Sequence, residues 1–376
     1  MKHIQLFRPY YRTNEVLKEL KKSLDSGWTG LGPVTKLFEQ DIASYLGVKY
    51  VKMVNSGTAG LHLALKLLNL EEGSEVITTP LTFVSTNHVL LYEKLKPVFC
   101  DVRQETGCID ERKIEELITE NTRAIMVVHY GGLPANMDAI NRLGRIYNLP
   151  IIEDSAHAFG SSYRGHKIGD SPNICVFSFH PVKPLPTSDS GAVTTNNRLY
   201  KQRLDRLCWL GIDKSTYDRS GSGSYTWEYN VPEVGYKYHG NDLVASVARV
   251  SMRHVDEDLE RRKEIVQMYR EGLKDLGWLS FVPSLGYLAE HPECESANHL
   301  CVVRVPKKPI FMERMKAAGI ECGCHYTPNT RYPMYAGAKV PVVDKLYEEI
   351  VSLPLHMMLT DKDVQYIIKT IREIWD

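Results

Sequence analysis

Long apolar runs, an excess of charge of one sign and a regular spacing of cysteines are all missing from this sequence. No apolar stretch reaches the ~20 residues needed to cross a bilayer, and the N-terminus lacks the apolar core of a signal peptide. Because Lys and Arg together number 46, as do Asp and Glu, the sequence predicts no general attraction to nucleic acid or acidic lipid. We expect a cytoplasmic protein with neither nucleic acid nor a membrane as a partner.

The eight cysteines show no disulfide framework, which predicts a reducing compartment and unpaired thiols. The one cluster with metal-binding residue types is Cys322-Gly323-Cys324-His325. A structural zinc site needs a second pair of ligands at suitable spacing, and the sequence offers no obvious pair. We therefore expect no metal site.

The pattern of elements predicts an α/β protein. With 376 residues, of which 43% are hydrophobic and 24% charged, the chain is long enough for two or three cores. Residues 12–46 have a helical pattern that the glycines and proline of 26–33 interrupt. Strands and helices then alternate, which favours a mainly parallel sheet covered on both faces. The expected strands are 50–55, 75–79, 97–101, 124–129, 150–154, 174–179 and 192–195, and the expected helices include 59–68, 85–92, 110–118 and 137–147.

The second half of the chain changes in character. Residues 211–230 are rich in Gly, Ser and Tyr and show no helical or strand period, so we expect a long loop. A charged helix at about 244–276 follows and leads to a smaller C-terminal domain. We expect a large domain over 1–245 and a small α/β domain over 246–376.

Ligands of parallel sheets bind beyond the carboxyl ends of the strands. Ser56-Gly57-Thr58-Ala59 stands at such a position, between a short apolar run and a buried helix. There, free backbone N–H groups and the helix dipole attract an anion such as a phosphate, Gly57 allows close approach, and Thr58 offers a hydroxyl. The alternative is an ordinary glycine turn with a Thr N-cap.

An acidic residue ends another buried strand. Asp154 closes Ile151-Ile152-Glu153-Asp154, where a carboxylate is costly without a cationic partner. A protonated pyridine nitrogen is one such partner, and a cap of a following helix is the alternative. His157, close behind, is placed either to pack on such a ring or hydrogen-bond its phenolic oxygen, or to be a satisfied, inert histidine.

The third candidate group at a strand end is the amine of a lysine. Lys183 follows the apolar strand that contains Ser178 and lies in proline-rich sequence, where a desolvated lysine is suited to Schiff-base formation. Ser178 is placed to reach a phosphate, and Phe83 is a flat group after the strand that ends at Thr79. An amine, an acid, a phosphate site and a flat group are what pyridoxal 5'-phosphate (PLP) requires of a protein. Together these residues predict a PLP site.

At this point the chain resembles the DegT/StrS class of sugar-nucleotide aminotransferases, which have fold type I. The resemblance runs over nearly the whole length, and its motifs stand in the order that the class shows. They are Ser26-Gly27-Trp28 with Gly32-Pro33, Ser56-Gly57-Thr58, Thr82-Phe83-Val84-Ser85-Thr86, Glu153-Asp154-Ser155-Ala156-His157, Ser178-Phe179-His180 with Lys183, Gly235-Tyr236-Lys237-Tyr238, Cys324-His325-Tyr326 with Pro328, and Ser352-Leu353-Pro354-Leu355.

The resemblance implies a large domain built on a seven-stranded, mainly parallel sheet, and it implies roles for single residues. Lys183 would hold the cofactor and move protons, and His325 would lie near the sugar as a second catalytic residue. The cofactor would contact Gly57, Thr58, Ala59, Phe83, Asp154, His157 and Ser178, and the substrate would contact Trp28, Gly30, His325 and Tyr326. The class implies a homodimer with active sites shared between subunits, where loop 211–230 and either Lys237 or Asn241 reach the partner's site.

The implied reaction moves an amino group from L-glutamate, which leaves as 2-oxoglutarate, to a nucleotide-linked keto sugar. The leading acceptor is a 4-keto-6-deoxyhexose on dTDP, UDP or GDP, and the product is an aminosugar for a surface polysaccharide or glycoconjugate. A 3-keto sugar, a keto-cyclitol, a PLP-dependent deoxysugar dehydratase and a non-catalytic PLP-binding regulator are the alternatives. The retained Lys183 favours transamination over dehydration, because some dehydratases of the class have a histidine there.

Several positions depart from the pattern of the class. His157 stands where glutamine is usual, Thr330 where a second histidine is frequent, and Lys237 where asparagine often reaches the neighbour's phosphate. The loop 184–191 is richer in proline than is usual, with Asp189 in place of a glutamate. These changes leave the cofactor chemistry intact and bear on the substrate.

Overall fold

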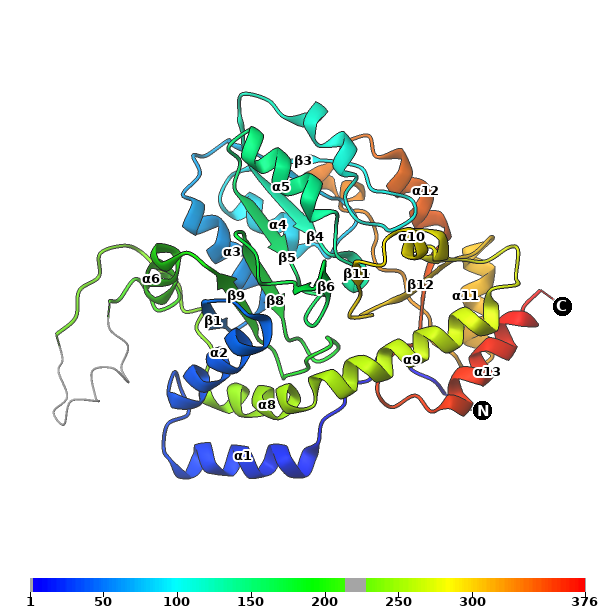
Figure 1. Cartoon of the computed structure of the whole chain (residues 1–376), viewed down its shortest axis with the longest axis horizontal. Helices are drawn as coiled ribbons and strands as arrows, with labels where there is room; N and C mark the ends of the chain where they lie inside the picture. The colour runs from blue at the N-terminus through cyan, green and yellow to red at the C-terminus, as the bar shows by residue number, and fades with distance from the viewer. Residues whose placement is uncertain (1–2, 214–227, 376) are drawn as a thin grey trace.

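The computed structural model describes residues 3–213 and 228–375, and its central feature is a seven-stranded sheet with the order β1-β9-β8-β5-β4-β2-β3 (Figure 1). Of these strands, only β9 runs antiparallel to its neighbours, and the others share one direction. The prediction of a mainly parallel sheet is thus confirmed. The strands are β1 (Tyr50–Val54), β2 (Glu75–Thr78), β3 (Lys96–Phe99), β4 (Thr122–Val128), β5 (Ile151–Asp154), β8 (Ile174–Ser178) and β9 (Gly191–Thr195).

Helices cover both faces of this sheet, because successive strand side chains point to opposite sides. In β1, Val54 packs into a hydrophobic cluster with α3, α4 and α6, while Met53 packs into another with α2 and α8. In β4, Ile125 and Val127 pack on the face that α5 covers. The helices are α2 (Pro33–Leu46), α3 (Gly57–Leu68), α4 (Ser85–Tyr92), α5 (Met137–Ile146), α6 (Arg198–Leu207) and α8 (Asp242–Arg253).

A second, antiparallel sheet of three strands has the order β10-β12-β13 and lies toward the C-terminal end of the chain. It packs with α9, α11 and α13 in one hydrophobic cluster, which Ile4 from the N-terminal segment also joins. The two termini lie on the same side of the molecule in Figure 1. The elements are β10 (Ser280–Val282), β12 (Cys301–Arg304), β13 (Ile350–Leu353), α9 (Val255–Leu273), α11 (Lys308–Ala317) and α13 (Asp361–Arg372).

The remaining elements are short or peripheral. They are α1 (Thr13–Asp25), α10 (Leu285–Glu290), α12 (Pro341–Glu349), and a small sheet of β6 (Ser162–Tyr163), β7 (His166–Lys167) and β11 (Cys294–Glu295). The interruption expected inside residues 12–46 is confirmed, since α1 ends at Asp25 and α2 begins at Pro33. Most of the predicted loop 211–230 lies outside the described residues, and the domain boundary at 245/246 stays a prediction.

The long helix predicted at 244–276 is wrong as one element. Asn241 accepts a hydrogen bond from the amide of Val244 and so starts α8 at Asp242. His254 then leaves the helical region, with φ −116° and ψ 9°, and its Nε2 lies 3.1 Å from Glu15 of α1. The chain resumes as α9 at Val255. The contact of His254 with Glu15 on α1 therefore interrupts a segment whose sequence is helical on both sides.

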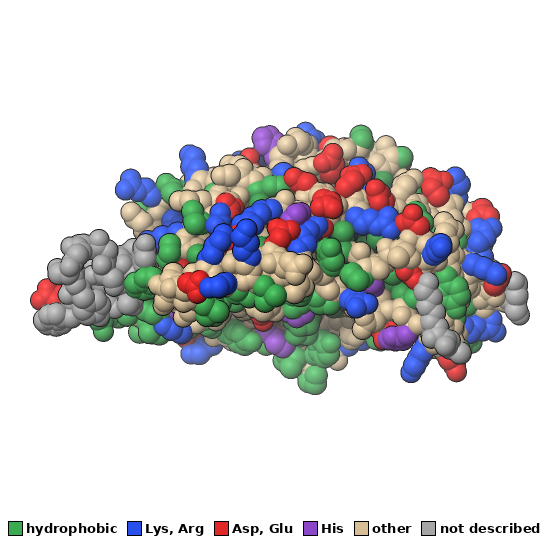
Figure 2. All heavy atoms as spheres, turned by 90° about the horizontal axis from the view of Figure 1, so that it is seen from below, with side chains coloured by type: hydrophobic (Ala, Val, Ile, Leu, Met, Phe, Trp, Pro, Cys, Tyr) green, Lys and Arg blue, Asp and Glu red, His purple; other side chains and the backbone are tan. Residues whose placement is uncertain are grey.

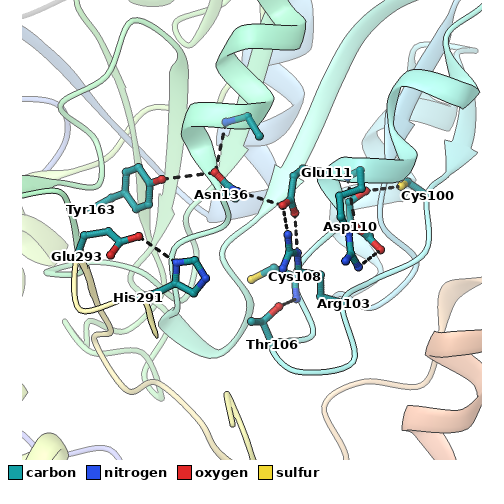
Figure 3. A network of polar contacts seen from close by, with 12 residues as sticks. Cys100, Arg103, Thr106, Cys108, Asp110, Glu111, Asn136, Tyr163, His291 and Glu293 are labelled. Carbon is teal, nitrogen blue, oxygen red and sulfur yellow. Dashed lines mark hydrogen bonds and ion pairs between the residues drawn. The ribbon is translucent and has the colours of Figure 1, made fainter. Parts of the chain in front are cut away.

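The helix predicted at 110–118 is two single turns of 3₁₀ helix, Glu111–Lys113 and Glu115–Leu117. Asp110 accepts hydrogen bonds from the backbone and side chain of Arg112, and such local side-chain contacts compete with a regular helix. Figure 3 shows how Arg103 pairs with Glu111, and how Asn136 at the start of α5 joins Glu111 to Tyr163 of β6. The network fixes the segment after β3 against the sheet.

Charges of both signs lie side by side on the surface. Figure 2 shows this for the face seen from below, and Arg253 of α8 pairs with Glu19 of α1 at 3.0 Å. Among residues 3–213 and 228–375, no helix combines the length and apolar character needed to span a bilayer.

Candidate active site

A cavity of about 330 Å³ opens at the carboxyl end of the parallel strands, and its volume is typical of small-molecule sites. Its walls come from the segments that follow β1, β2, β5 and β8, and from the C-terminal part of the chain. Most residues that the sequence singled out lie here. Those that line the cavity are Gly57, Thr58, Phe83, Asp154, His157, Ser178, Lys183, His325 and Tyr326.

One end of the cavity is formed by the N-terminus of α3. Ser56 is the N-cap, and its hydroxyl accepts a hydrogen bond from the amide of Ala59 at 3.1 Å. The first amides of the helix, at Gly57 and Thr58, have no acceptor within the helix. A Cβ atom on Gly57 would lie 2.9 Å from the Cβ of Ser178, so only glycine allows this close approach. Together with the helix dipole, this arrangement suits an anion.

Replacing Gly57 by alanine is expected to weaken the binding of a phosphorylated ligand about tenfold, because the methyl group must push Ser178 out of the anion site. The dissociation constant of PLP, from titration of the unloaded protein, measures this. Gly277→Ala is the matched control, since its new methyl group would meet no atom within 4 Å. Equal affinities of the two variants would show that the site tolerates a side chain at 57.

Asp154 ends β5 and is buried. Its Oδ2 accepts a hydrogen bond from the Thr86 hydroxyl at 2.7 Å, and its Oδ1 accepts one from the Ala156 amide at 3.1 Å. Burial raises the pKa of Asp154, and these two donors oppose the shift. No cation lies within ion-pair distance of the carboxylate in the described part of the chain, and no described helix starts directly after it. The site therefore suits a cationic ligand atom.

Lys183 lies in the loop between β8 and β9, and its side chain enters the same cavity. Burial lowers the pKa of the Lys183 amine to about 8, while the negative charge of Asp154 opposes this shift. Its Nζ lies 3.5 Å from Nε2 of His299, within hydrogen-bond distance. An amine with such a pKa is partly neutral near neutral pH and is therefore able to act as a nucleophile and a base.

His157 is buried, with 4% of its surface exposed. Its Nδ1 lies 3.2 Å from the backbone nitrogen of Gly131, and its Nε2 lies 2.8 Å from the Tyr326 hydroxyl. Burial lowers the pKa of His157 well below its ordinary value, and the positive charge of Lys183 adds to the shift. The ring is therefore neutral, and both of its nitrogens have partners in the protein.

Two further residues shape the cavity. Phe83 is half exposed, and its ring centre lies 6.0 Å from that of Tyr326. His325 accepts or donates a hydrogen bond with Ser352 at 2.8 Å, and burial lowers its pKa to about 4. Phe83 thus offers a flat apolar face, and His325 offers a neutral ring.

Five predicted residues do not line this cavity, namely Trp28, Gly30, Ala59, Lys237 and Asn241. The Ala59 amide is taken by Ser56, and Asn241 caps α8. The Nζ of Lys237 lies 3.4 Å from the ring centre of Trp209. The resemblance assigns Lys237 and Asn241 to a partner's site, and this assignment stays a prediction.

Other residues also line the cavity, among them Phe7 and His299, which the sequence did not single out as site residues. Phe7 comes from the N-terminal segment, and its ring stacks on His299 at 5.8 Å. His299 lies two residues before β12 and meets Lys183 only through the tertiary fold. Ser56, which the sequence placed in the phosphate-binding segment, lines the cavity and is the N-cap of α3. The others that line the cavity are Leu61, Thr82, Ser85, Val128, Ala156, Val176, His180, Val182 and Asp189.

Comparison with known proteins gives matches over nearly the full length. The DegT/DnrJ/EryC1/StrS aminotransferase family matches residues 11–372. The spore coat polysaccharide biosynthesis protein SpsC of Bacillus subtilis is 32% identical, over 96% of this chain and 94% of its own. The sugar aminotransferase CalS13 of Micromonospora echinospora superposes with a TM-score of 0.89 at 30% identity, over 98% of this chain and 99% of its own. The PLP-form of Spr1654 of Streptococcus pneumoniae superposes with a TM-score of 0.88 at 28% identity, over 98% of this chain and 97% of its own.

Proposed function

Since this chain belongs to the DegT/DnrJ/EryC1/StrS aminotransferase family and is a PLP-dependent sugar aminotransferase, we propose that it moves an amino group from L-glutamate to a nucleotide-linked keto sugar. A 4-keto-6-deoxyhexose on dTDP, UDP or GDP is the proposed acceptor. The product is proposed to enter a surface polysaccharide, in line with the name of SpsC. The observation that carries the proposal is that a lysine amine and a buried carboxylate with no ion-pair partner among the described residues lie on one cavity.

The residues present fit PLP. The cradle of Gly57, Thr58 and Ser178 would hold the phosphate, because a Cβ at 57 would fill it. Asp154 has no ion-pair partner among residues 3–213 and 228–375 and would face the pyridine nitrogen, and Lys183 would bind the aldehyde. Phe83 would lie against the ring.

When bound, PLP withdraws electrons from Cα of the donor and carries the amino group to the acceptor. Lys183 Nζ would take the proton from Cα of the donor and deliver it to the cofactor carbon that receives the amino group, because an amine with a pKa of about 8 exchanges protons readily near neutral pH. The carboxylate of Asp154 would hold a proton at the ring nitrogen. The retained lysine supports transamination over dehydration, as expected from the sequence.

The proposal is tested by loading the protein with pyridoxamine phosphate and adding a panel of keto-sugar nucleotides. We expect 4-keto-6-deoxyhexose nucleotides to restore the absorbance of lysine-bound PLP and to yield an aminosugar of the expected mass. 3-Keto sugars and keto-cyclitols serve as comparison substrates. A response to those alone would replace the proposed acceptor, and ammonia release with a deoxygenated sugar would indicate a dehydratase.

The rate at which PLP attaches to Lys183 should depend on pH in a defined way. Only the neutral amine attacks the aldehyde, so the rate constant should rise about tenfold per pH unit below about pH 8 and level off above it. Stopped-flow absorbance of the unloaded protein mixed with PLP measures this. A rate that keeps rising toward the ordinary lysine pKa of 10.5 would contradict the lowered value.

We further propose a homodimer in which Lys237 or Asn241 reaches the partner's site. Neither residue lines the cavity of its own chain. Mixing inactive Lys183→Ala subunits with weakened Lys237→Ala subunits should then restore activity, because one site of each mixed dimer is intact. Asn241→Ala is the parallel variant. If neither mixture exceeds the sum of its parts, each site is complete within one chain.

A further inference from the structure

The side chain of Tyr326 is held by a directed chain of hydrogen bonds that begins at the protein backbone. The backbone nitrogen of Gly131, in the turn after β4, lies 3.2 Å from Nδ1 of His157. A backbone N–H always donates, so Nδ1 of His157 must accept and carries no hydrogen. The ring is neutral because burial disfavours its charged form. Its single hydrogen must therefore be on Nε2.

The next hydrogen bond follows from this tautomer. Nε2 of His157 lies 2.8 Å from the hydroxyl oxygen of Tyr326, and the two rings are nearly parallel at 22°. His157 is the donor of this bond and Tyr326 the acceptor. Both ring nitrogens of His157 are thus used by the protein, which leaves none for a ligand. The hydrogen bond from His157 to the cofactor's phenolic oxygen, one of its expected roles, therefore finds no free ring nitrogen, whereas packing of the His157 ring against the cofactor stays a prediction.

The hydroxyl hydrogen of Tyr326 has no acceptor among the described residues. Within the described part of the chain, His157 is the sole hydrogen-bond partner of this hydroxyl, and it is a donor. Tyr326 lines the same cavity as Lys183, and its ring centre lies 6.0 Å from that of Phe83. Burial and the negative charge of Asp154 raise the pKa of Tyr326, so the phenol keeps its hydrogen. The hydrogen is free to point toward an oxygen of a molecule in the cavity.

We propose that Tyr326 donates a hydrogen bond to an oxygen of the bound ligand, and that His157 is the positioning residue that turns the Tyr326 hydroxyl toward it. The ligand oxygen is either the phenolic oxygen of the cofactor or an oxygen of the sugar. This assignment rests on the proposed function for the identity of the ligand. The direction of the two bonds within the protein does not depend on it.

The direction is tested first, without any ligand. Protein labelled with ¹⁵N in histidine, in its unloaded form, should show one imidazole as the Nε2–H tautomer that disappears in His157→Gln. Tyr326→Phe should shift the Nε2 signal of that ring and leave its tautomer unchanged. An Nδ1–H tautomer, or no response to Tyr326→Phe, overturns the inference whatever the protein catalyses.

The ligand contact is tested by a double-mutant cycle. We expect Tyr326→Phe to weaken binding about tenfold, either of pyridoxamine phosphate or, with that affinity unchanged, of the keto sugar as a rise in KM. The first result assigns the oxygen to the cofactor and the second to the sugar. His157→Leu should cause a similar loss, and the double variant should be no weaker than either single one.

His157→Gln is the conservative variant, because its amide supplies both an acceptor for Gly131 and a donor for Tyr326. We expect it to bind within about twofold of the wild type. Losses that multiply in the double variant, or an unchanged affinity in Tyr326→Phe for both ligands, overturn the proposal. A wild-type protein that binds pyridoxamine phosphate but aminates no sugar would contradict the proposed function and leave the cofactor arm of this test intact.

Discussion

Replacement of Lys183 by alanine is expected to reduce turnover about 10⁴-fold and to remove the absorbance of lysine-bound PLP in the same variant. The cavity holds no second amine among the described residues that line it. The imidazoles of His157 and His325 are neutral at neutral pH, but neither forms a stable bond to an aldehyde. Single-turnover kinetics with glutamate measure the loss, and borohydride reduction followed by peptide mapping locates the bond at residue 183.

Two control variants separate loss of the amine from loss of the fold. Lys183→Arg keeps a positive charge in the cavity but cannot lose its proton near neutral pH, so it should be as inactive as the alanine variant. Lys167→Ala removes a surface lysine whose Nζ lies 4.1 Å from the ring centre of Tyr45, and it should keep full activity. Near-normal turnover of glutamate by Lys183→Ala would contradict the proposed mechanism.

The residues at strand ends were predictable from sequence because the sheet itself brings them together. In a parallel sheet the carboxyl ends of β1, β5 and β8 meet at one edge, so Gly57, Asp154 and Ser178 need only their own strands to be recognised. The same reasoning places Lys183 in the loop after β8. The local sequence pattern of each strand, together with the rule that ligands bind at the carboxyl ends of parallel strands, was enough to predict these cofactor residues.

Residues that reach the cavity through long-range packing were not predictable in this way. Phe7 arrives because Ile4 pairs with Ile320 and joins the C-terminal hydrophobic cluster. His299 lies 116 positions from Lys183, and nothing in its neighbourhood indicates that meeting. The kink at His254 has the same origin, since its cause is Glu15 on another helix. Periodicity describes one element at a time and carries no information on such contacts.

Replacement of Asp154 by asparagine is expected to lower kcat about 10²- to 10³-fold, with a smaller loss of PLP affinity. Removing one partner of a buried charge pair costs about 3–5 kcal/mol, and each ~1.4 kcal/mol is tenfold in rate or affinity. Asparagine is able to keep the bonds from Thr86 and Ala156, so the cavity should retain its shape. What is lost is the negative charge that holds a proton on the ring nitrogen. The ratio of kcat to that of the wild type and the PLP dissociation constant measure the two effects separately.

The neighbouring Glu153 provides the matched control, because its carboxylate is equally buried but has its partners inside the protein. It lies 2.9 Å from Nε2 of His129 and accepts hydrogen bonds from Ser171 and Asn173. Burial raises the pKa of Glu153, but the contact with His129 outweighs this and lowers it. Glu153→Gln should therefore lower the melting temperature and leave the kinetics of the folded protein nearly unchanged. If both variants lose stability but keep normal kinetics, the cofactor does not supply the cationic partner of Asp154.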